Sequence, residues 1–305
     1  MDRATRYALL MAFFWALNIF FGKLALNAGY DPFALSAQTA VVAAVAYYAV
    51  NIAIERREAG KILQRWKALA AIGVAYAFAG VSGGLGLLYS TSINYGFLIK
   101  TTLIFTPLLC ALWLREKITR TDWTIIAALL AGSYLVSTGG VLLVPRLGDL
   151  LIVAAALGYS AATVPQKMLG EKYDVVLTGF YRLAVSAPLL FAFAAATGRD
   201  ALAVPAPLPM LLCAVSLYLC NLYITKTLSV ASPAYMTMIN NVTPVIVAAL
   251  GIAFLSEMMN AVQVAGAAII LAGGFVNYSG LKAGASAATS RPSALTLRRR
   301  HSSSV

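Results

Sequence analysis

One pattern occurs twice in this chain: an apolar helix, a short charged elbow and a second apolar helix. The first copy spans residues 94–139 and the second spans 235–280. A single constant offset aligns Glu116 with Glu257, Gly132 with Gly273, Gly139 with Gly280, Lys100 with Asn241 and Leu103 with Pro244. One glutamate after an apolar run would be weak evidence, but a glutamate and two glycines in one register indicate an internal duplication.

The duplication continues toward the N-terminus of each copy. Residues 15–23 (WALNIFFGK) align with 159–167 (YSAATVPQK), and Thr39 then aligns with Arg182. We therefore divide the chain into an N-terminal repeat (1–143), a C-terminal repeat (144–282) and a basic cytoplasmic tail (283–305) that we expect to be disordered. Internal repeats of this kind are typical of many secondary transporters.

The composition requires a membrane. The chain is 61% hydrophobic and only 11% charged, with a mean hydropathy of +0.81, whereas a soluble domain has roughly 25% charged residues. A membrane-spanning helix needs about 20 apolar residues. We read ten such stretches, at 6–27, 33–54, 68–89, 93–114, 121–143, 148–168, 176–196, 207–228, 234–256 and 261–282. The first follows the N-terminus without a small-residue cleavage site, so we expect no cleaved signal peptide.

The basic residues indicate how these spans are oriented. Cytoplasmic loops carry an excess of Lys and Arg, and most of the 23 basic residues fall in cytoplasmic loops if both termini are cytoplasmic. The net charge of +12 then follows from topology and requires no nucleic-acid partner. Each repeat holds five spans, and an odd number reverses the second repeat. We therefore predict an all-α integral membrane fold of ten transmembrane helices, as two inverted five-helix repeats in the cell (inner or plasma) membrane.

Several motifs support a resemblance to a known family. They are the two elbows at 114–119 and 255–260, the glycines aligned after them, the runs at 92–100 and 232–241, and the aromatic residues Trp15 and Tyr159 at the same point of each first span. With these motifs the chain resembles the drug/metabolite transporter superfamily in its ten-span EamA-type form. One departure is Leu103, where the pattern usually has proline.

The resemblance implies an architecture and a class of activity. Spans 1, 3, 4, 6, 8 and 9 would surround a central cavity like a basket, and spans 5 and 10 would support it from behind. Members of this superfamily move amino acids, nucleosides, sugar phosphates, drugs and other small metabolites, mostly without ATP.

Lys100 is the strongest candidate for substrate binding. It lies about a third of the way into its span, and a charge at the centre of a bilayer costs about 2.5–3.5 kcal/mol on insertion scales, so such residues usually face a cavity or a partner. The functional interpretation is a cationic site for a carboxylate or phosphate. The structural alternative is a lysine that reaches the membrane surface or binds a helix carbonyl. Its repeat mate Asn241 would lie near it at the membrane midplane.

Other candidates share helix faces with these two. Thr237 and Asn241 lie on one face of the ninth span, with Asn240 adjacent, and hydrogen bonds between helices are their structural alternative. Trp15 and Asn18 share a face of the first span, and Tyr159 holds the matching position in the sixth. An aromatic stripe is more often packing than a substrate wall, but the repeated position favours a role for this pair.

Three weaker candidates complete the set. Tyr95 and Tyr218 are equally explained as residues of the aromatic belt at the membrane surface. Arg182 can reach the cytoplasmic surface or pair with Asp174 or Glu171. Structural expectations concern other residues: Glu116 and Glu257 cap the following helix or pair across the loop, the glycines of 79–86 let helices approach closely, and Pro107, Pro165, Pro188 and Pro244 interrupt their helices.

Missing residues also bear on mechanism. No Asp or Glu lies in mid-span, so we expect no embedded acid relay for protons. The chain has no phosphate-binding GxxxxGK[ST] loop and its only histidine, His301, lies in the tail. Cys110, Cys213 and Cys220 lack metal-site or disulfide spacing and are expected to be buried thiols. We therefore predict no cofactor, no metal and no enzymatic activity.

The leading functional prediction is a secondary transporter of small polar metabolites, such as an amino-acid exporter, that works by alternating access. An organic-anion or sugar-phosphate exchanger with Lys100 as its anion site is the alternative, and an intramembrane enzyme or a channel is a remote one. The expected partners are a small-molecule substrate and the lipid bilayer, without nucleic acid. We expect a monomer or a weak homodimer.

Overall fold

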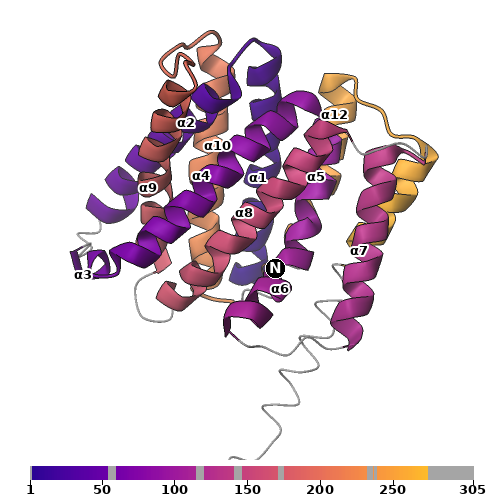
Figure 1. Ribbon diagram of the computed structural model, residues 1–305, viewed down its shortest axis with the longest axis horizontal. Coiled ribbons are helices and arrows are strands. Elements are labelled where there is room, and N and C mark those ends of the chain that lie inside the picture. Colours follow the sequence, from indigo (N-terminus) through magenta and orange to yellow (C-terminus); the bar gives the residue numbers. More distant parts are fainter. Residues whose placement is uncertain are drawn as a thin grey trace, which may run out of the picture.

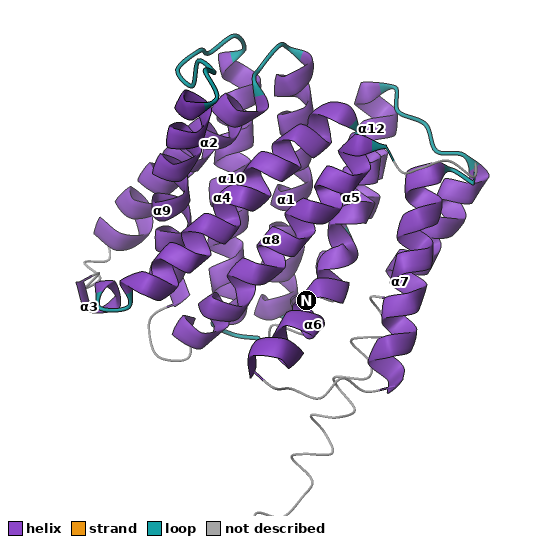
Figure 2. Ribbon diagram, viewed as in Figure 1, coloured by secondary structure: helices purple, strands orange, loops and turns teal. Residues whose placement is uncertain are grey.

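The computed structural model describes residues 2–53, 60–114, 120–140, 146–170, 175–231, 236 and 239–273, and in these residues it contains helices and no strands (Figure 2). The helices are α1 (Arg3–Asn27), α2 (Pro32–Tyr47), α3 (Gly60–Leu63), α4 (Trp66–Tyr89), α5 (Ser92–Leu98), α6 (Thr102–Leu114), α7 (Arg120–Thr138), α8 (Leu147–Gly170), α9 (Val175–Ala196), α10 (Pro207–Leu228) and α12 (Thr243–Leu255). A π-helix, Tyr48–Ala53, extends α2, a 3₁₀ turn, Ile99–Thr101, joins α5 to α6, and a further helix spans Ala261–Gly273.

Each of the ten predicted spans contains helix. Five helices are long and apolar enough to cross a membrane: Arg3–Asn27, Pro32–Ile52, Trp66–Tyr89, Val176–Ala196 and Pro207–Thr227. The other apolar helices are shorter within the described residues, so the count of ten spans stays a prediction. Large apolar side chains such as Leu112, 72% exposed, and Phe254, 70% exposed, point outward. A soluble protein rarely presents such a surface, and a bilayer covers it.

The helices begin where the sequence supplies caps. The Asp2 carboxylate accepts a hydrogen bond from Thr5 N (2.9 Å), and that of Asp31 accepts one from Phe33 N (2.9 Å). Thr91 does the same for α5, where its hydroxyl accepts from Asn94 N (3.0 Å). Each cap satisfies a backbone N–H that has no partner inside the helix.

The contacts between the two repeats come in matched pairs. α1 packs against α10 and α4 against α8, and exchanging the repeats turns the first contact into the second. In the same way, the contact of α6 with α8 matches that of α1 with α12, while α2 meets its own counterpart α9. Figure 1 shows α4 and α8 crossing the middle of the molecule, with α7 and the helix Ala261–Gly273 together at one side. These two helices approach closely, because a Cβ on Gly132 would lie 2.9 Å from Gly266 O.

The glycine patch on α4 has the role that the sequence predicts. A Cβ on Gly83 would lie 2.8 Å from the Tyr95 hydroxyl, and one on Gly86 would lie 2.7 Å from Ile152 Cγ1. Glycine therefore lets α5 and α8 approach the backbone of α4, which is the usual role of small residues between membrane helices.

The prediction that prolines interrupt their helices is wrong for Pro165 and Pro188, but the turn at 241–242 does interrupt the predicted span 234–256 just before Pro244. Pro165 and Pro188 lie inside α8 and α9, which continue through them, and Pro244 lies in the first turn of α12. A first-turn proline gives up no helical hydrogen bond, since that N–H has no partner inside the helix anyway. Membrane helices also tolerate interior prolines when neighbours satisfy the freed carbonyl. The two breaks lie at Ile99–Thr101, which contains no proline, and at the turn 241–242, where Pro244 has no N–H to donate to Asn240 O.

Glu257 joins the two repeats at one end of the molecule, which we call the Glu257 face. Its carboxylate accepts hydrogen bonds from Ser92 N (2.7 Å), Ser92 Oγ (2.8 Å) and Ile93 N (3.0 Å). The expectation that Glu257 caps the helix after it was therefore wrong: it caps α5 of the other repeat. The N-terminus of a helix attracts a carboxylate from any element that the fold brings near it. Glu116 lies outside the described residues.

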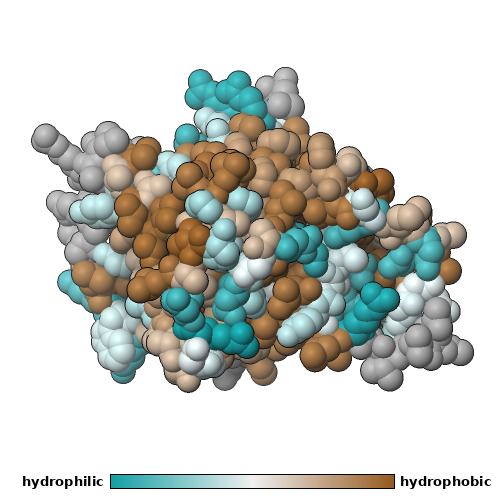
Figure 3. All heavy atoms as spheres, turned by 90° about the horizontal axis from the view of Figure 1, so that it is seen from above, coloured by the Kyte–Doolittle hydropathy of each residue, from teal (hydrophilic) through white to brown (hydrophobic). Residues whose placement is uncertain are grey.

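Further polar contacts tie helices together at this face, where Figure 3 shows polar residues interspersed with apolar ones. The Lys23 ammonium donates to Leu87 O (2.7 Å) and Ser90 O (2.6 Å) at the end of α4. The buried Asp149 carboxylate accepts from the side chains of Ser90, Asn94 and Ser137. Gln38 Nε2 donates to Ala201 O (2.9 Å) and Ala203 O (3.0 Å), which ties α2 to the α9–α10 loop.

Candidate functional site

Lys100 joins the two helix breaks at the centre of the molecule. It lies in the 3₁₀ turn Ile99–Thr101 and is only 4% exposed. Its ammonium donates a hydrogen bond to Asn240 O (2.8 Å), just before the turn at 241–242. The side chain therefore does not reach the membrane surface. It satisfies a carbonyl that a broken helix leaves without its helical partner.

The asparagines at the second break differ from each other. Asn240 Oδ1 accepts a hydrogen bond from Thr243 Oγ1 (2.7 Å), and the same hydroxyl also reaches Ala12 O of α1 (3.3 Å). The Asn241 Nδ2 atom is buried and has no partner among the described residues. Thr237 lies outside the described residues. One asparagine of the pair therefore shapes the break, and the other keeps an amide donor available there.

An aromatic cluster lies beside these breaks. The Trp15 and Tyr159 rings, from matching positions of the two repeats, meet edge to face with their centroids 5.9 Å apart. Tyr76 meets Tyr159 in the same way at 5.3 Å. The buried Tyr95 and the half-buried Tyr159 are hydrogen-bonded through their side chains. Spans that are far apart in sequence thus contribute to a single wall.

A cavity of about 90 Å³ adjoins this cluster. Its lining residues are Asn18, Gly22, Leu35, Ser36, Thr39, Ala40, Tyr76, Gly80, Gly84, Tyr95, Tyr159, Leu190, Cys213 and Leu217. Asn18 is anchored there, since its Nδ2 donates to Cys213 O (3.0 Å). The volume corresponds to about three water molecules at roughly 30 Å³ each. The cavity in this conformation is therefore small.

Arg182 packs against the Tyr76 ring, and it forms no ion pair with an acidic side chain among the described residues. Its guanidinium carbon is 4.9 Å from the centroid of the Tyr76 ring, a cation–π contact. Its Nη1 donates to Gln166 Oε1 (3.3 Å), and its Nε is buried without a partner in the described residues. Asp174 and Glu171, the partners expected from the sequence, lie outside the described residues.

Tyr218 lies apart from the cavity. Its ring meets that of Tyr47 at 6.1 Å, and its hydroxyl accepts a hydrogen bond from Asn51 Nδ2 (3.4 Å). It therefore helps to hold α10 against α2. The structure thus brings Asn18, Tyr95 and Tyr159 together at the cavity, with Trp15 packed against Tyr159. It links Lys100 with Asn240, and it places Tyr218 in a contact between α10 and α2.

Two residues of the centre were missed by the sequence analysis: Tyr76 and Asn221. Asn221 is fully buried, its Nδ2 donates to Leu217 O (2.8 Å), and its Oδ1 has no partner among the described residues. An asparagine in the middle of the apolar stretch 207–228 was a signal that could have identified it, because a buried amide is costly without partners. Tyr76 gave no comparable signal, since tyrosines are common in membrane spans.

The centre contains two basic side chains, Lys100 and Arg182. Lys100 and Arg182 both lie close enough to Cys220 to act on it electrostatically. Within the described part of the chain, the only ion pair is that of Arg199 with Asp31 (3.2 Å), on the Glu257 face. The described residues include no group of metal ligands, and Cys213 and Cys220 are buried and free. The side chain of Cys110 is not among the described side chains.

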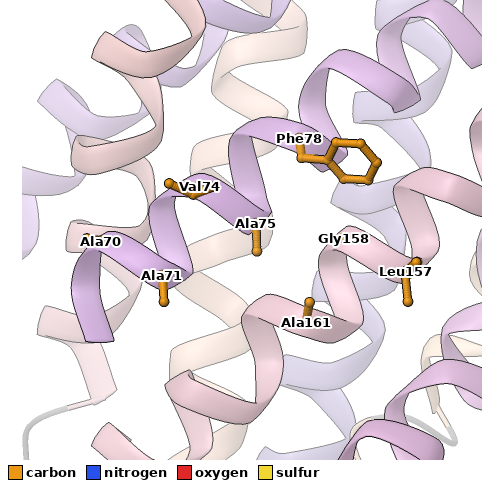
Figure 4. A pocket seen from close by; sticks show the side chains of 8 residues that line it. All are labelled: Ala70, Ala71, Val74, Ala75, Phe78, Leu157, Gly158 and Ala161. Atoms are coloured by element: carbon orange, nitrogen blue, oxygen red, sulfur yellow. The ribbon is translucent and has the colours of Figure 1, made fainter. Parts of the chain in front are cut away.

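A larger hollow, of about 620 Å³, lies on the outer surface between α4 and α8. Figure 4 shows its lining, which consists of Ala70, Ala71, Val74, Ala75, Phe78, Leu157, Gly158 and Ala161. These side chains carry no polar group that could select a metabolite. An apolar groove of this kind suits lipid chains, so the smaller polar cavity is the better candidate site.

Comparisons with known proteins agree with this arrangement. A crystal structure described only as that of a protein has a TM-score of 0.64 and 16% sequence identity to this chain, and the match covers 90% of this chain and 96% of that one. At this identity the likeness concerns the fold alone. No curated protein matches the chain. The model of the EamA-like transporter family matches twice, at residues 4–138 and 146–279, which are the two repeats. The chain therefore belongs to the EamA-like transporter family and is a multi-pass membrane transporter.

Proposed function

We propose that the protein is a secondary carrier that moves small polar metabolites across the cell membrane by alternating access, with export of amino acids or related metabolites as its cellular role. The observation that carries the proposal is the meeting of two helix breaks, at Lys100 and at Asn240, one from each repeat. Discontinuous helices at the interface of two repeats are the usual place for a carrier's substrate site. The aromatic wall and the polar cavity lie beside them.

The positions of helix ends support two inverted repeats. At the Glu257 face, Lys23 near the end of α1 binds Ser90 after α4, and Asp149 at the start of α8 binds the same serine. α1 thus ends where its counterpart α8 begins. In the same way α12 ends beside the start of its counterpart α5, which Glu257 caps. Two oppositely oriented units can rock against each other around a shared central site, which is the basis of alternating access.

The distribution of charge supports cytoplasmic termini. The described basic residues at the end opposite the Glu257 face are Arg3, Arg6, Lys61, Arg65, Lys67, Arg120, Lys167 and Lys226. Those near the Glu257 face are Lys23, Arg146 and Arg199. Cytoplasmic surfaces carry the basic excess, so we assign the Glu257 face to the outside. Single cysteines placed at Arg3 and at Arg199 test this assignment, because a membrane-impermeant thiol reagent added to intact cells must label only the second.

An organic-anion exchanger is the second candidate function. The specific observation in its favour is the pair of interior cations, Lys100 and Arg182, for which the described residues provide no carboxylate partner. An exchanger would require bound anion for the conformational change. It would therefore show exchange but no net flux.

Counterflow in liposomes tests both candidates. Purified protein is reconstituted in vesicles loaded with one metabolite, and uptake of its labelled form is followed with and without internal substrate. A carrier must show saturable uptake that internal substrate accelerates, whereas linear flux without acceleration would indicate a channel. Replacing Lys100 with Met separates the candidates. Loss confined to anionic substrates supports the exchanger, and equal loss for neutral substrates assigns Lys100 to the helix break alone.

A further inference from the structure

We propose that Arg182, Asn221 and Tyr76 form a subsite for a small carboxylic acid that also carries a hydrogen-bond donor, as α-hydroxy acids and α-amino acids do. The inference rests on the proposed carrier function and deepens it by naming the chemical class of the substrate. It starts from two polar atoms that the fold buries without partners, one of them a donor and the other an acceptor.

The donor is the Nε of Arg182. The guanidinium of Arg182 is held by two contacts. Its Nη1 donates a hydrogen bond to Gln166 Oε1 (3.3 Å), and its Cζ lies 4.9 Å from the centroid of the Tyr76 ring. The Nε atom is buried and has no partner in the described residues. A fixed guanidinium with an unused N–H is well suited to bind a carboxylate, since its planar donors match the two acid oxygens.

The acceptor is the Oδ1 of Asn221. This side chain is fully buried, and its Nδ2 donates to Leu217 O (2.8 Å). That bond fixes the orientation of the amide, because the amide oxygen cannot donate to a carbonyl. Oδ1 is therefore directed elsewhere, and it has no partner among the described residues. A hydroxyl or ammonium group on a ligand would supply the donor that this oxygen lacks.

Tyr76 brings the two groups into the reach of one ligand. The Arg182 guanidinium lies over the Tyr76 ring, and the Asn221 side chain interacts with the same tyrosine. Tyr76 also lines the cavity of about 90 Å³, together with Asn18 and Tyr95. The same tyrosine therefore contacts the arginine, the asparagine and the cavity. A rotation of Tyr76 would join them into one space for a ligand of a few carbon atoms.

The charge of the centre favours an acid over its neutral analogue. Lys100 is a second buried basic group, and it lies near Cys220, as Arg182 does. The ion pair of Arg199 with Asp31 is the only one in the part of the chain that the structure describes, and it lies at the Glu257 face. Buried cations are stabilised by a counter-ion. An anionic ligand supplies this counter-ion, and the amide of the same acid does not.

The test measures binding by the shift in melting temperature of the purified full-length protein. The probes are L-lactate and L-alanine, their amides lactamide and alaninamide, and propionate, which keeps the carboxylate but lacks the second donor. We expect both acids to stabilise the protein, propionate to do so less, and the amides to have no effect. Equal stabilisation by lactate and lactamide would overturn the proposal, and this comparison needs no variant.

Variants assign the two contacts. Arg182→Gln should weaken lactate binding by at least about tenfold, whereas Arg199→Gln, which removes an arginine from the surface ion pair, should change it by less than about twofold. Asn221→Leu should abolish the preference for lactate over propionate and leave propionate binding unchanged. Full retention of lactate affinity in Arg182→Gln, with a monodisperse elution profile, would refute the subsite.

Counterflow separates this inference from the carrier function. One outcome is a protein that exchanges a neutral metabolite in vesicles but neither binds nor transports the acids. That outcome would support the carrier function and refute the subsite. Protein that binds the acids with the expected pattern but shows no counterflow of any solute would support the subsite and refute the carrier function.

Discussion

The two repeats share a scaffold but differ in the chemistry at equivalent positions. Lys100 and Asn241 occupy the two helix breaks, and of these two only the lysine bonds from one break to the other within the described residues, to Asn240 O (2.8 Å). Thr39 and Arg182 are also aligned, and the threonine hydroxyl binds Leu35 O of its own helix (2.7 Å) while the guanidinium lies over Tyr76. Duplication thus repeated the helices and their packing, and substitution made the centre asymmetric.

This asymmetry has a physical reason. A repeated scaffold is favoured because each helix contact then forms twice, as in the matched pairs α1 with α10 and α4 with α8. A substrate, by contrast, is itself asymmetric, and buried charges are costly without a partner. Two lysines facing each other across the pseudo-two-fold axis would repel. One cation and one amide at the breaks avoid this cost and allow a ligand with distinct ends.

The largest expected effect comes from removing the bond between the breaks. Lys100→Met leaves Asn240 O without its donor and removes a buried charge, so we expect counterflow of an anionic substrate to fall by about 10- to 100-fold. Asn241→Leu, at the matching position, should cost less, because the Asn241 Nδ2 atom holds no partner in the described residues. Lys226→Met serves as the matched control, since this lysine is exposed. Equal losses in the first two variants would contradict the asymmetry.

The next effect concerns the aligned glycines of the supporting helices. Gly132→Ala places a Cβ 2.9 Å from Gly266 O, and backbone cannot move aside easily, so we expect a loss of about 1–3 kcal/mol in stability. Gly273→Ala meets only the side chain of Leu129, at 3.2 Å, and should cost clearly less. Thermal unfolding of the two variants, side by side, measures the difference. A larger drop for Gly273→Ala would show that the two packing positions are misassigned.

A smaller effect is expected at the aligned glutamates. Glu257→Ala removes three hydrogen bonds to the start of α5 and should lower stability by about 1–2 kcal/mol, as for the loss of a helix cap. In the aligned register, Pro233 stands where Ser92 stands, and proline has no N–H to donate. Glu116→Ala should therefore cost less than Glu257→Ala in the same unfolding assay. Equal costs would mean that the two elbows are chemically equivalent.

The smallest effect is expected at the surface ion pair. Arg199 is 58% exposed and its bond to Asp31 is 3.2 Å long, so Arg199→Gln should cost less than about 1 kcal/mol, and less still in high salt. Stability measured at low and at high ionic strength checks this. A large, salt-insensitive loss would show that the Glu257 face depends on this pair more than on the contacts of Glu257.

Much of the scaffold could be predicted from the sequence. Membrane spans are visible because lipid demands about 20 apolar residues in a row, and the duplication is visible because Glu116 and Glu257 align in one register with two glycines each. The meeting of Lys100 with the second break, at Asn240, and the contact of Trp15 with Tyr159 follow from the same repeat. Each of these features is local in the chain or is copied from one repeat to the other.

The tertiary structure decided what the repeat does not encode. Which carbonyl Lys100 binds, which helix Glu257 caps, and the burial of Arg182 Nε and Asn221 Oδ1 without partners all depend on contacts between helices distant in sequence. Composition cannot rank such contacts, because an amide or a charge in an apolar span requires a partner without specifying which one. The position of the breaks was hidden for a related reason: proline marks a possible interruption, and packing determines whether the helix continues through it.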